Sequence, residues 1–67
     1  MAKIQLNGKK VTIKPKLTIH NLLKRFKLNE KKVAIEHNGI IVQKSNYKKK
    51  YLKNNDKLEV VHFIGGG

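Results

Sequence analysis

Apolar and polar residues alternate in two short runs at the start of the chain. The apolar positions of these runs are Ile4, Leu6, Val11 and Ile13, and polar or charged residues flank most of them. Asn7-Gly8 separates the runs, and this dipeptide suits a tight turn whose two central residues both have positive φ. The chain is therefore predicted to open with a β-hairpin.

The spacing of apolar residues becomes helical after Pro15. Apolar side chains then fall at i, i+3, i+4 and i+7, namely Ile19, Leu22, Leu23 and Phe26. This stripe predicts an amphipathic helix of about ten residues. Thr18 is a good N-cap, but Asn21 stands where a capping box has Glu or Gln, so we expect a partial cap.

Three further segments complete the pattern. Residues 33–36 and 40–42 predict short strands joined by a turn at Asn38-Gly39. Residues 45–55 are polar and rich in lysine, and they predict a helical turn and a loop. Its three large side chains, Tyr47, Tyr51 and Leu52, are expected to anchor it to the body of the domain. Residues 57–64 form the longest alternating apolar run, so this strand is expected at the centre of a sheet.

The order of these elements predicts the fold. A strand–helix–strand connection within one sheet is right-handed and makes its strands parallel, which here requires a mixed sheet. We expect an α+β architecture in which a mixed sheet of about four to five strands carries one helix on one face. This is the β-grasp, or ubiquitin-like, fold. Its domain is expected to cover residues 1–64, and residues 65–67 are expected to form a flexible tail.

The charge of the chain is strongly positive. Its 67 residues include 16 Lys and Arg against 4 Asp and Glu, a formal net charge of +12. Such a balance favours polyanionic partners. However, Arg25 is the single arginine, and base-edge recognition relies on the planar fork of arginine. Residues 47–51 do combine tyrosines with lysines, as single-strand binders do, so a small basic RNA-binding domain is kept as an alternative to a solvated loop.

Other residue types exclude several kinds of chemistry. There is no cysteine, which excludes disulfides, thiolate metal sites and cysteine nucleophiles. The histidines, His20, His37 and His62, have no ligand spacing, and no metal site is expected. The chain also lacks a secretory apolar run at its N-terminus and any stretch near the roughly 18 apolar residues of a membrane span. We therefore expect a cytoplasmic location.

The most informative feature is the terminal tripeptide Gly65-Gly66-Gly67. Its side chains are minimal, so it can pass through a narrow channel into the active site of another protein. Its reactive group is the α-carboxylate of Gly67, which is ionised and a poor electrophile at neutral pH. Activation by transfer of AMP from ATP would make it reactive. The chain has no phosphate-binding loop and no catalytic nucleophile for that step, so we expect no enzyme activity and no cofactor bound by the chain itself.

Two apolar residues precede this tail. Alternate side chains of a strand point to opposite faces of the sheet. If Leu58 and Val60 face the helix, Val61 and Phe63 are therefore expected on the face opposite the helix. There they would serve to dock a partner. Packing against the loop around Tyr47 is the alternative, and the sequence favours neither.

Four segments resemble one known family. Residues 33–42 read VAIEHNGIIV and resemble the "VAVExNGxIV" segment of the ThiS family, the sulfur carriers of thiamin biosynthesis. Residues 56–67 read DKLEVVHFIGGG and resemble the family's glycine-terminated ending. Residues 4–8 and 18–23 match its opening strand and turn and the start of its helix. The resemblance covers the chain from end to end.

The resemblance implies a reaction cycle. A ThiF-like adenylyltransferase would use ATP to adenylate Gly67, and sulfur from a donor such as a cysteine desulfurase would replace AMP to give a thiocarboxylate. The thiocarboxylate would then donate sulfur to a ThiG-like thiazole synthase, with Gly65 and Gly66 threading the tail into each partner. A MoaD-like carrier for molybdopterin synthesis and a ubiquitin-like modifier share this fold and tail, and both stay open. Gln43 replaces a common Pro of the family, and Asn55 replaces a usual Gly.

Overall fold

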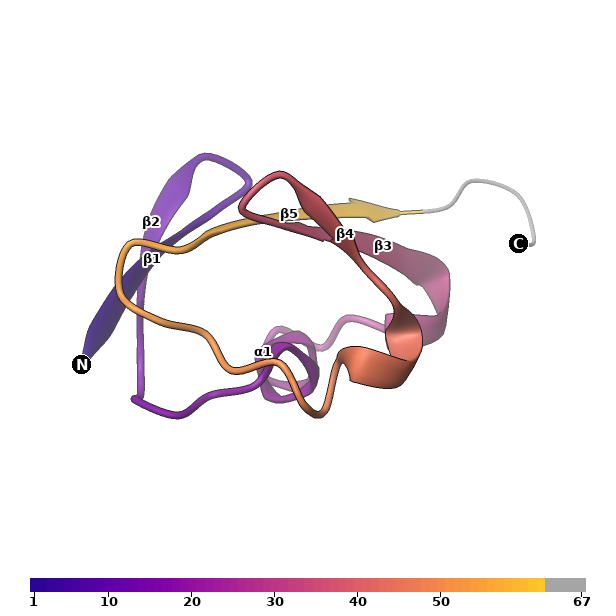
Figure 1. Cartoon of the computed structure of the whole chain (residues 1–67), viewed down its shortest axis with the longest axis horizontal. Coiled ribbons are helices and arrows are strands. Elements are labelled where there is room, and N and C mark those ends of the chain that lie inside the picture. Colours follow the sequence, from indigo (N-terminus) through magenta and orange to yellow (C-terminus); the bar gives the residue numbers. More distant parts are fainter. Residues whose placement is uncertain (63–67) are drawn as a thin grey trace.

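The structure is a computed structural model that describes residues 1–62. Within this range the strands form one five-stranded sheet, and one α-helix lies against it (Figure 1). The strands are β1 (Ala2–Leu6), β2 (Lys9–Ile13), β3 (Val33–His37), β4 (Ile40–Val42) and β5 (Lys57–His62). The helix is α1 (Ile19–Arg25), and two 3-10 turns cover Glu30–Lys32 and Lys44–Asn46.

Strand β5 lies in the middle of the sheet. The strand order is β2-β1-β5-β3-β4, and β5 runs parallel to β1 and antiparallel to β3. Its pairing with β3 extends from His37↔Leu58 to Val33↔His62. Its pairing with β1 joins Gln5↔Lys57 and Leu6↔Leu58. The predicted mixed sheet and the central position of the last strand are confirmed.

Helix α1 is shorter than predicted but better capped. It ends at Arg25, since Phe26 is the C-cap and Lys27 follows in the left-handed region at φ 58°. The backbone N–H of Asn21 donates to Thr18 Oγ1 at 3.1 Å, and the Thr18 N–H donates to Asn21 Oδ1 at 3.4 Å. The prediction of a partial cap was wrong, because the amide oxygen of Asn21 accepts the return bond that Glu or Gln makes in other capping boxes.

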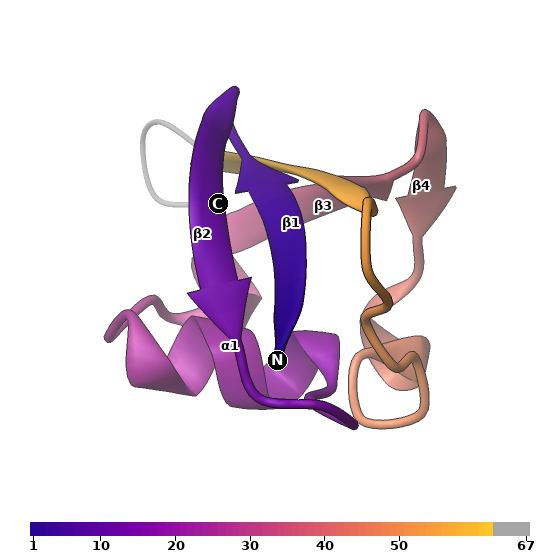
Figure 2. The ribbon, with the colours of Figure 1, turned by 90° about the vertical axis from the view of Figure 1, so that its left-hand side faces the viewer.

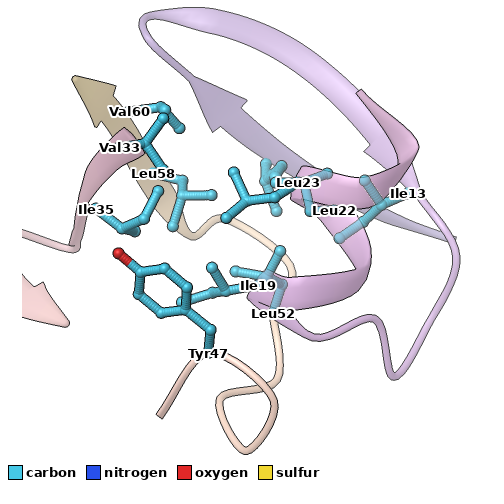
Figure 3. Close-up of a cluster of buried hydrophobic side chains, with 11 residues drawn as sticks. Ile13, Ile19, Leu22, Leu23, Val33, Ile35, Tyr47, Leu52, Leu58 and Val60 are labelled. Atoms are coloured by element: carbon cyan, nitrogen blue, oxygen red, sulfur yellow. The ribbon is translucent and has the colours of Figure 1, made fainter. Parts of the chain in front are cut away.

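Helix α1 lies against one face of the sheet (Figure 2), and the buried side chains of the core lie between them (Figure 3). Tyr47, only 1% exposed, reaches from its loop toward Ile35 of β3 (Figure 3), and Leu52 is 3% exposed. Both are the anchors that the sequence predicts. Tyr51 is not, because its side chain is 54% exposed and only its backbone bridges to Thr18. The remaining buried apolar residues are Ile4, Ile13, Ile19, Leu22, Leu23, Val33, Ile35, Leu58 and Val60.

The residue before β5 is a buried aspartate that ties three segments together. The Asp56 carboxylate accepts hydrogen bonds from the Lys53 N–H at 2.7 Å and from Asn38 Nδ2 at 3.1 Å, and it pairs with His37 Nε2 at 2.7 Å. Partial burial alone would raise the pKa of the Asp56 carboxyl, but the hydrogen bonds from His37, Lys53 and Asn38 outweigh burial and lower this pKa below its ordinary value of 3.8. Asp56 therefore fixes where β5 begins.

Replacement of this carboxylate is expected to make a pH-dependent difference to stability. Asp56→Asn should lower the free energy of unfolding by about 1–3 kcal/mol at neutral pH, because the charged acceptor of three bonds is lost. A carboxylate whose pKa is depressed on folding stabilises the protein fully above its unfolded pKa, and this contribution disappears as the pH falls through the folded pKa. Urea unfolding at neutral and acidic pH should thus show a gap between wild type and variant that narrows below pH 3.8. A gap that stays constant into strong acid would contradict this assignment.

The two departures from the family pattern fit the backbone at their positions. Asn55 has φ 71°, in the left-handed region that Gly adopts most easily and that Asn tolerates better than most residues. Gln43 has φ −73° and ψ 145°, the conformation that Pro prefers. Gln43 and Asn55 therefore adopt backbone conformations that the family's usual Pro and Gly also adopt easily.

Candidate functional site

The candidate site is the end of β5 and the sheet face beside it. Strand β5 ends at His62, three residues before Gly65 in the sequence, and His62 pairs with Val33, the first residue of β3. The predicted site residues Phe63, Gly65, Gly66 and Gly67 lie outside the described residues. The structure does define β5, the strand that precedes them in the sequence, and we call this strand the platform of the tail.

Two turn residues hold this platform on both sides. The side chain of Asn7 donates to the Val60 carbonyl at 3.3 Å and accepts from the Val60 N–H at 2.7 Å, so it continues the ladder of β1 beyond the end of that strand. On the other side, Asn38 Oδ1 accepts from the Lys57 N–H at 2.7 Å. The Asn-Gly pattern at these positions predicts tight turns and nothing more. The φ values of 50° for Asn7 and 53° for Asn38 confirm the turns. Nothing in the local pattern reveals that the Asn7 side chain bonds to a residue about 50 positions away and the Asn38 side chain to one about 20 positions away.

The face of the sheet opposite α1 has no covering element within residues 1–62 (Figures 1 and 2). We call it the open face, and it carries Val61 and Glu59 of β5, Ala34 and Glu36 of β3, and Ile41 of β4. Val61 is 58% exposed and Ile41 is 74% exposed. Tyr47 is buried under the opposite face. For Val61, the alternative of packing against the Tyr47 loop is therefore wrong, and its predicted docking role stays a prediction.

Two of the three histidines form ion pairs within the fold, and the third, His62, is exposed at the end of β5. His20 Nδ1 pairs with Glu30 at 2.9 Å, and His37 pairs with Asp56. In the described part of the chain, no three His, Cys, Asp or Glu side chains are grouped to hold a metal ion. In residues 47–51, the burial of Tyr47 leaves Tyr51 as the one aromatic side chain that could stack on a base.

No helix among residues 1–62 is long and apolar enough to span a membrane.

The strand order, the parallel pairing of β1 with β5 and the single helix on one face define the β-grasp class of ubiquitin-like folds. The sequence model of the ThiS family matches residues 4–67, and the chain belongs to this family. The fold and the family that the sequence predicts are thus confirmed.

Three similar proteins illustrate the match. The chain is 43% identical over 65 residues to the sulfur carrier protein ThiS of Bacillus subtilis, covering 96% of this chain and 98% of that protein. It is 40% identical over 65 residues to a thiazole synthase of Paramagnetospirillum magneticum, covering 97% of this chain but 20% of that protein. The crystal structure of the thiamine biosynthesis protein ThiS from Geobacter metallireducens superposes with a TM-score of 0.84 at 28% identity, covering 97% of this chain and 99% of that one.

Proposed function

We propose that this protein is a sulfur carrier for thiazole formation in thiamin biosynthesis, and that its reactive group is the carboxylate of Gly67. The observation that carries the proposal is the match to the ThiS family through residue 67, the last glycine. A carrier of this kind is a co-substrate, so the catalytic groups belong to its partners. The chain itself binds no cofactor in this scheme.

The chemistry follows from the state of the carboxylate. A C-terminal carboxyl with a pKa of roughly 3.3–3.7 is ionised at neutral pH and resists attack by a nucleophile. In the first step a carboxylate oxygen attacks the α-phosphorus of ATP on a ThiF-like adenylyltransferase, and pyrophosphate leaves. In the second step sulfide attacks the acyl carbon; where a cysteine desulfurase is the sulfur donor, its persulfide attacks instead, and a thiol then reduces the resulting acyl disulfide to release the thiocarboxylate. AMP leaves with the bridging oxygen, and Gly67 ends in a thiocarboxylate.

The partner for the final step is a ThiG-like thiazole synthase. Two bacterial thiazole synthases support this partner. This chain matches 20% of the length of each, so a carrier-like segment and the synthase share one polypeptide in those proteins. A fusion of this kind places two proteins in reach of each other at high effective concentration. The carrier would present its thiocarboxylate directly to the synthase that consumes it.

The geometry of β5 restricts where a partner binds. Residues 63–67 span at most about 18 Å from His62 to Gly67, at about 3.5 Å per extended residue. An active site that receives Gly67 must therefore lie close to the end of the sheet. We propose that Val61 and Phe63 contribute apolar contacts there, since Val61 is exposed on the open face.

Intact mass spectrometry tests the proposed function. The protein is incubated with ATP, a ThiF-type adenylyltransferase and sodium sulfide. We expect its mass to rise by the difference between one sulfur and one oxygen atom, and we expect no change when ATP is omitted. A wild-type chain that never gains this mass with a cognate adenylyltransferase would overturn the proposal.

The remaining alternatives predict different results. A MoaD-like carrier would be retained by a molybdopterin synthase rather than by a thiazole synthase in a pull-down. The named relatives favour the thiazole pathway.

Salt-sensitive RNA binding that is lost on substitution of Lys48, Lys49 and Lys50 would favour the RNA-binding alternative. The expected cytoplasmic location stays a prediction.

A further inference from the structure

The two edge strands of the sheet differ in charge. The strand order leaves β2 and β4 with one neighbouring strand each among residues 1–62. Strand β2 has the exposed residues Lys9 and Lys10, and lysines on an edge discourage another strand from pairing with it. Strand β4 reads Ile40-Ile41-Val42, and Ile40 is 71% and Ile41 74% exposed. The β4 edge thus lacks the charges that protect the β2 edge.

One residue of β4 offers its backbone to a further strand. The two-residue turn at Asn38-Gly39 is flanked by His37 and Ile40, and in such a hairpin the flanking residues exchange backbone hydrogen bonds. Because bonded and non-bonded pairs alternate along an antiparallel ladder, the N–H and C=O of Ile41 point away from β3 toward the free edge. Two backbone bonds hold an added strand weakly, so side chains must supply most of the affinity.

A hollow beside β4 provides room for such side chains. Residues 43–50 follow β4 in the chain and lie near it on the helix side of the sheet (Figure 2). Together with β4 they line a hollow of ≈ 590 Å³. Val42 pairs with the buried Ile35, so Val42 and Ile40 point to the helix side and form the apolar part of the lining. The hollow is therefore distinct from the open face.

The hollow also carries unneutralised positive charge. Lys49 and Lys50 belong to its lining, and none of the described residues that line it is acidic. Neither lysine forms an ion pair with any residue in the range 1–62. A second copy of this chain is a poor occupant, because symmetric pairing of two β4 strands would bring the same lysines of two +12 chains together. The charge of the hollow is complementary to carboxylates.

The alternation of side chains in a strand determines what an added segment must carry. A residue directly opposite Ile41 has its side chain on the same face as Ile41, where an apolar group packs against it. The residues before and after it point to the helix side, into the hollow, where acidic groups meet Lys49 and Lys50. The complementary segment is thus extended, with an apolar residue between two acidic ones.

We propose that the β4 edge binds an extended acidic segment of a partner protein, which joins the sheet as a further strand. In strand addition of this kind, backbone bonds fix the register and the pockets for alternate side chains give specificity. Strand β3 separates β4 from β5, so the contact involves neither the platform nor the tail. The proposal is therefore independent of the carrier chemistry at Gly67.

Titration of the full chain with synthetic peptides, followed by proton–nitrogen correlation NMR spectroscopy, tests the proposal. A blocked pentapeptide Thr-Glu-Val-Glu-Thr should shift the amide signals of Ile41, Lys49 and Lys50, and added salt should weaken its binding. A peptide with lysine in place of both glutamates should bind about tenfold more weakly, because its charge is reversed. The acidic peptide N-methylated at valine should also bind about tenfold more weakly, because it lacks the N–H that bonds to the Ile41 carbonyl.

Two double variants localise the binding site. Lys49→Gln with Lys50→Gln should weaken binding of the acidic peptide about tenfold. Lys9→Gln with Lys10→Gln is the matched control, because it removes the same charge from the other edge of the sheet, and its affinity should stay within about twofold of the wild type. All four lysines are exposed, so both variants should unfold at the wild-type temperature.

Several results would overturn the proposal. An unshifted Ile41 amide, or equal affinity for the acidic and lysine peptides, would show that no acidic strand binds at this edge. Equal losses in the two double variants would mean that net charge, rather than the hollow, attracts the peptide. Self-association of the free chain through the Ile41 amide would make a second copy the occupant. None of these results changes thiocarboxylate formation in the mass experiment, which tests the proposed function separately.

Discussion

Removal of Gly67 alone is expected to abolish formation of the thiocarboxylate while leaving the unfolding temperature unchanged. The truncated chain still ends in a glycine carboxylate, but this group falls about 3.5 Å short of the position that Gly67 reaches. Displacement of a reacting group by about 1 Å can cost a hundredfold in rate. Intact mass spectrometry after incubation with ATP, adenylyltransferase and sulfide should therefore show no sulfur on the truncated protein.

The control for this experiment is one extra glycine at the N-terminus. It also changes the chain by one glycine, but this glycine precedes β1 and is far in sequence from the tail. This variant should gain sulfur at the wild-type rate. If the truncated protein gained sulfur on Gly66 as fast as the wild type does on Gly67, the position of the carboxylate would not matter, and the assignment of Gly67 as the reactive residue would be wrong.

The largest effect on stability is expected for Ile35→Ala. Ile35 is 1% exposed and lies on β3, where its register partner on β5 is the buried Val60. Removal of a buried aliphatic side chain of this size costs about 2–5 kcal/mol, including the cavity that remains. A domain of this length has a total stability of about 3–10 kcal/mol. Urea denaturation should show a variant that is near or beyond the limit of folding.

Ile41→Ala is the matched control within the same hairpin. Ile41 lies on β4 beside β3, and the residue type and the substitution are identical, but its side chain is 74% exposed. The stability change should be within about 0.5 kcal/mol of zero. Similar losses for the two variants would mean that exposure does not distinguish these positions, and the assignment of the core to the helix side of the sheet would be wrong.

The sequence predicts the fold well wherever a local pattern encodes a local structure. Asn7-Gly8 and Asn38-Gly39 form the predicted turns, with positive φ at all four residues. The alternation of Leu58 and Val60 with Glu59 and Val61 correctly separates the buried face from the exposed one. This pattern also places Val61 on the open face, which is the part of the candidate site that periodicity can reveal.

The sequence predicts less where a side chain contacts a residue that is far away along the chain. The hydrogen bonds between Asn7 and Val60 and between His37 and Asp56 join residues that only the folded chain brings together. Tyr47 and Tyr51 look alike in a lysine-rich loop, and only the tertiary structure buries one and exposes the other. The position of Glu36 opposite Glu59 likewise depends on the register between β3 and β5, which no single segment specifies.

The central position of β5 has a consequence for synthesis of the chain on the ribosome. The hairpins β1–β2 and β3–β4 do not pair with each other, and both are joined to the sheet through β5. A nascent chain that has not yet reached Lys57 lacks the strand that unites these two halves, so the full sheet cannot form cotranslationally before that point. Pairing of β1 with β5 also closes a loop of about 50 residues, which slows folding. A complete sheet is thus present only after translation has passed through Lys57, close to the C-terminal glycines.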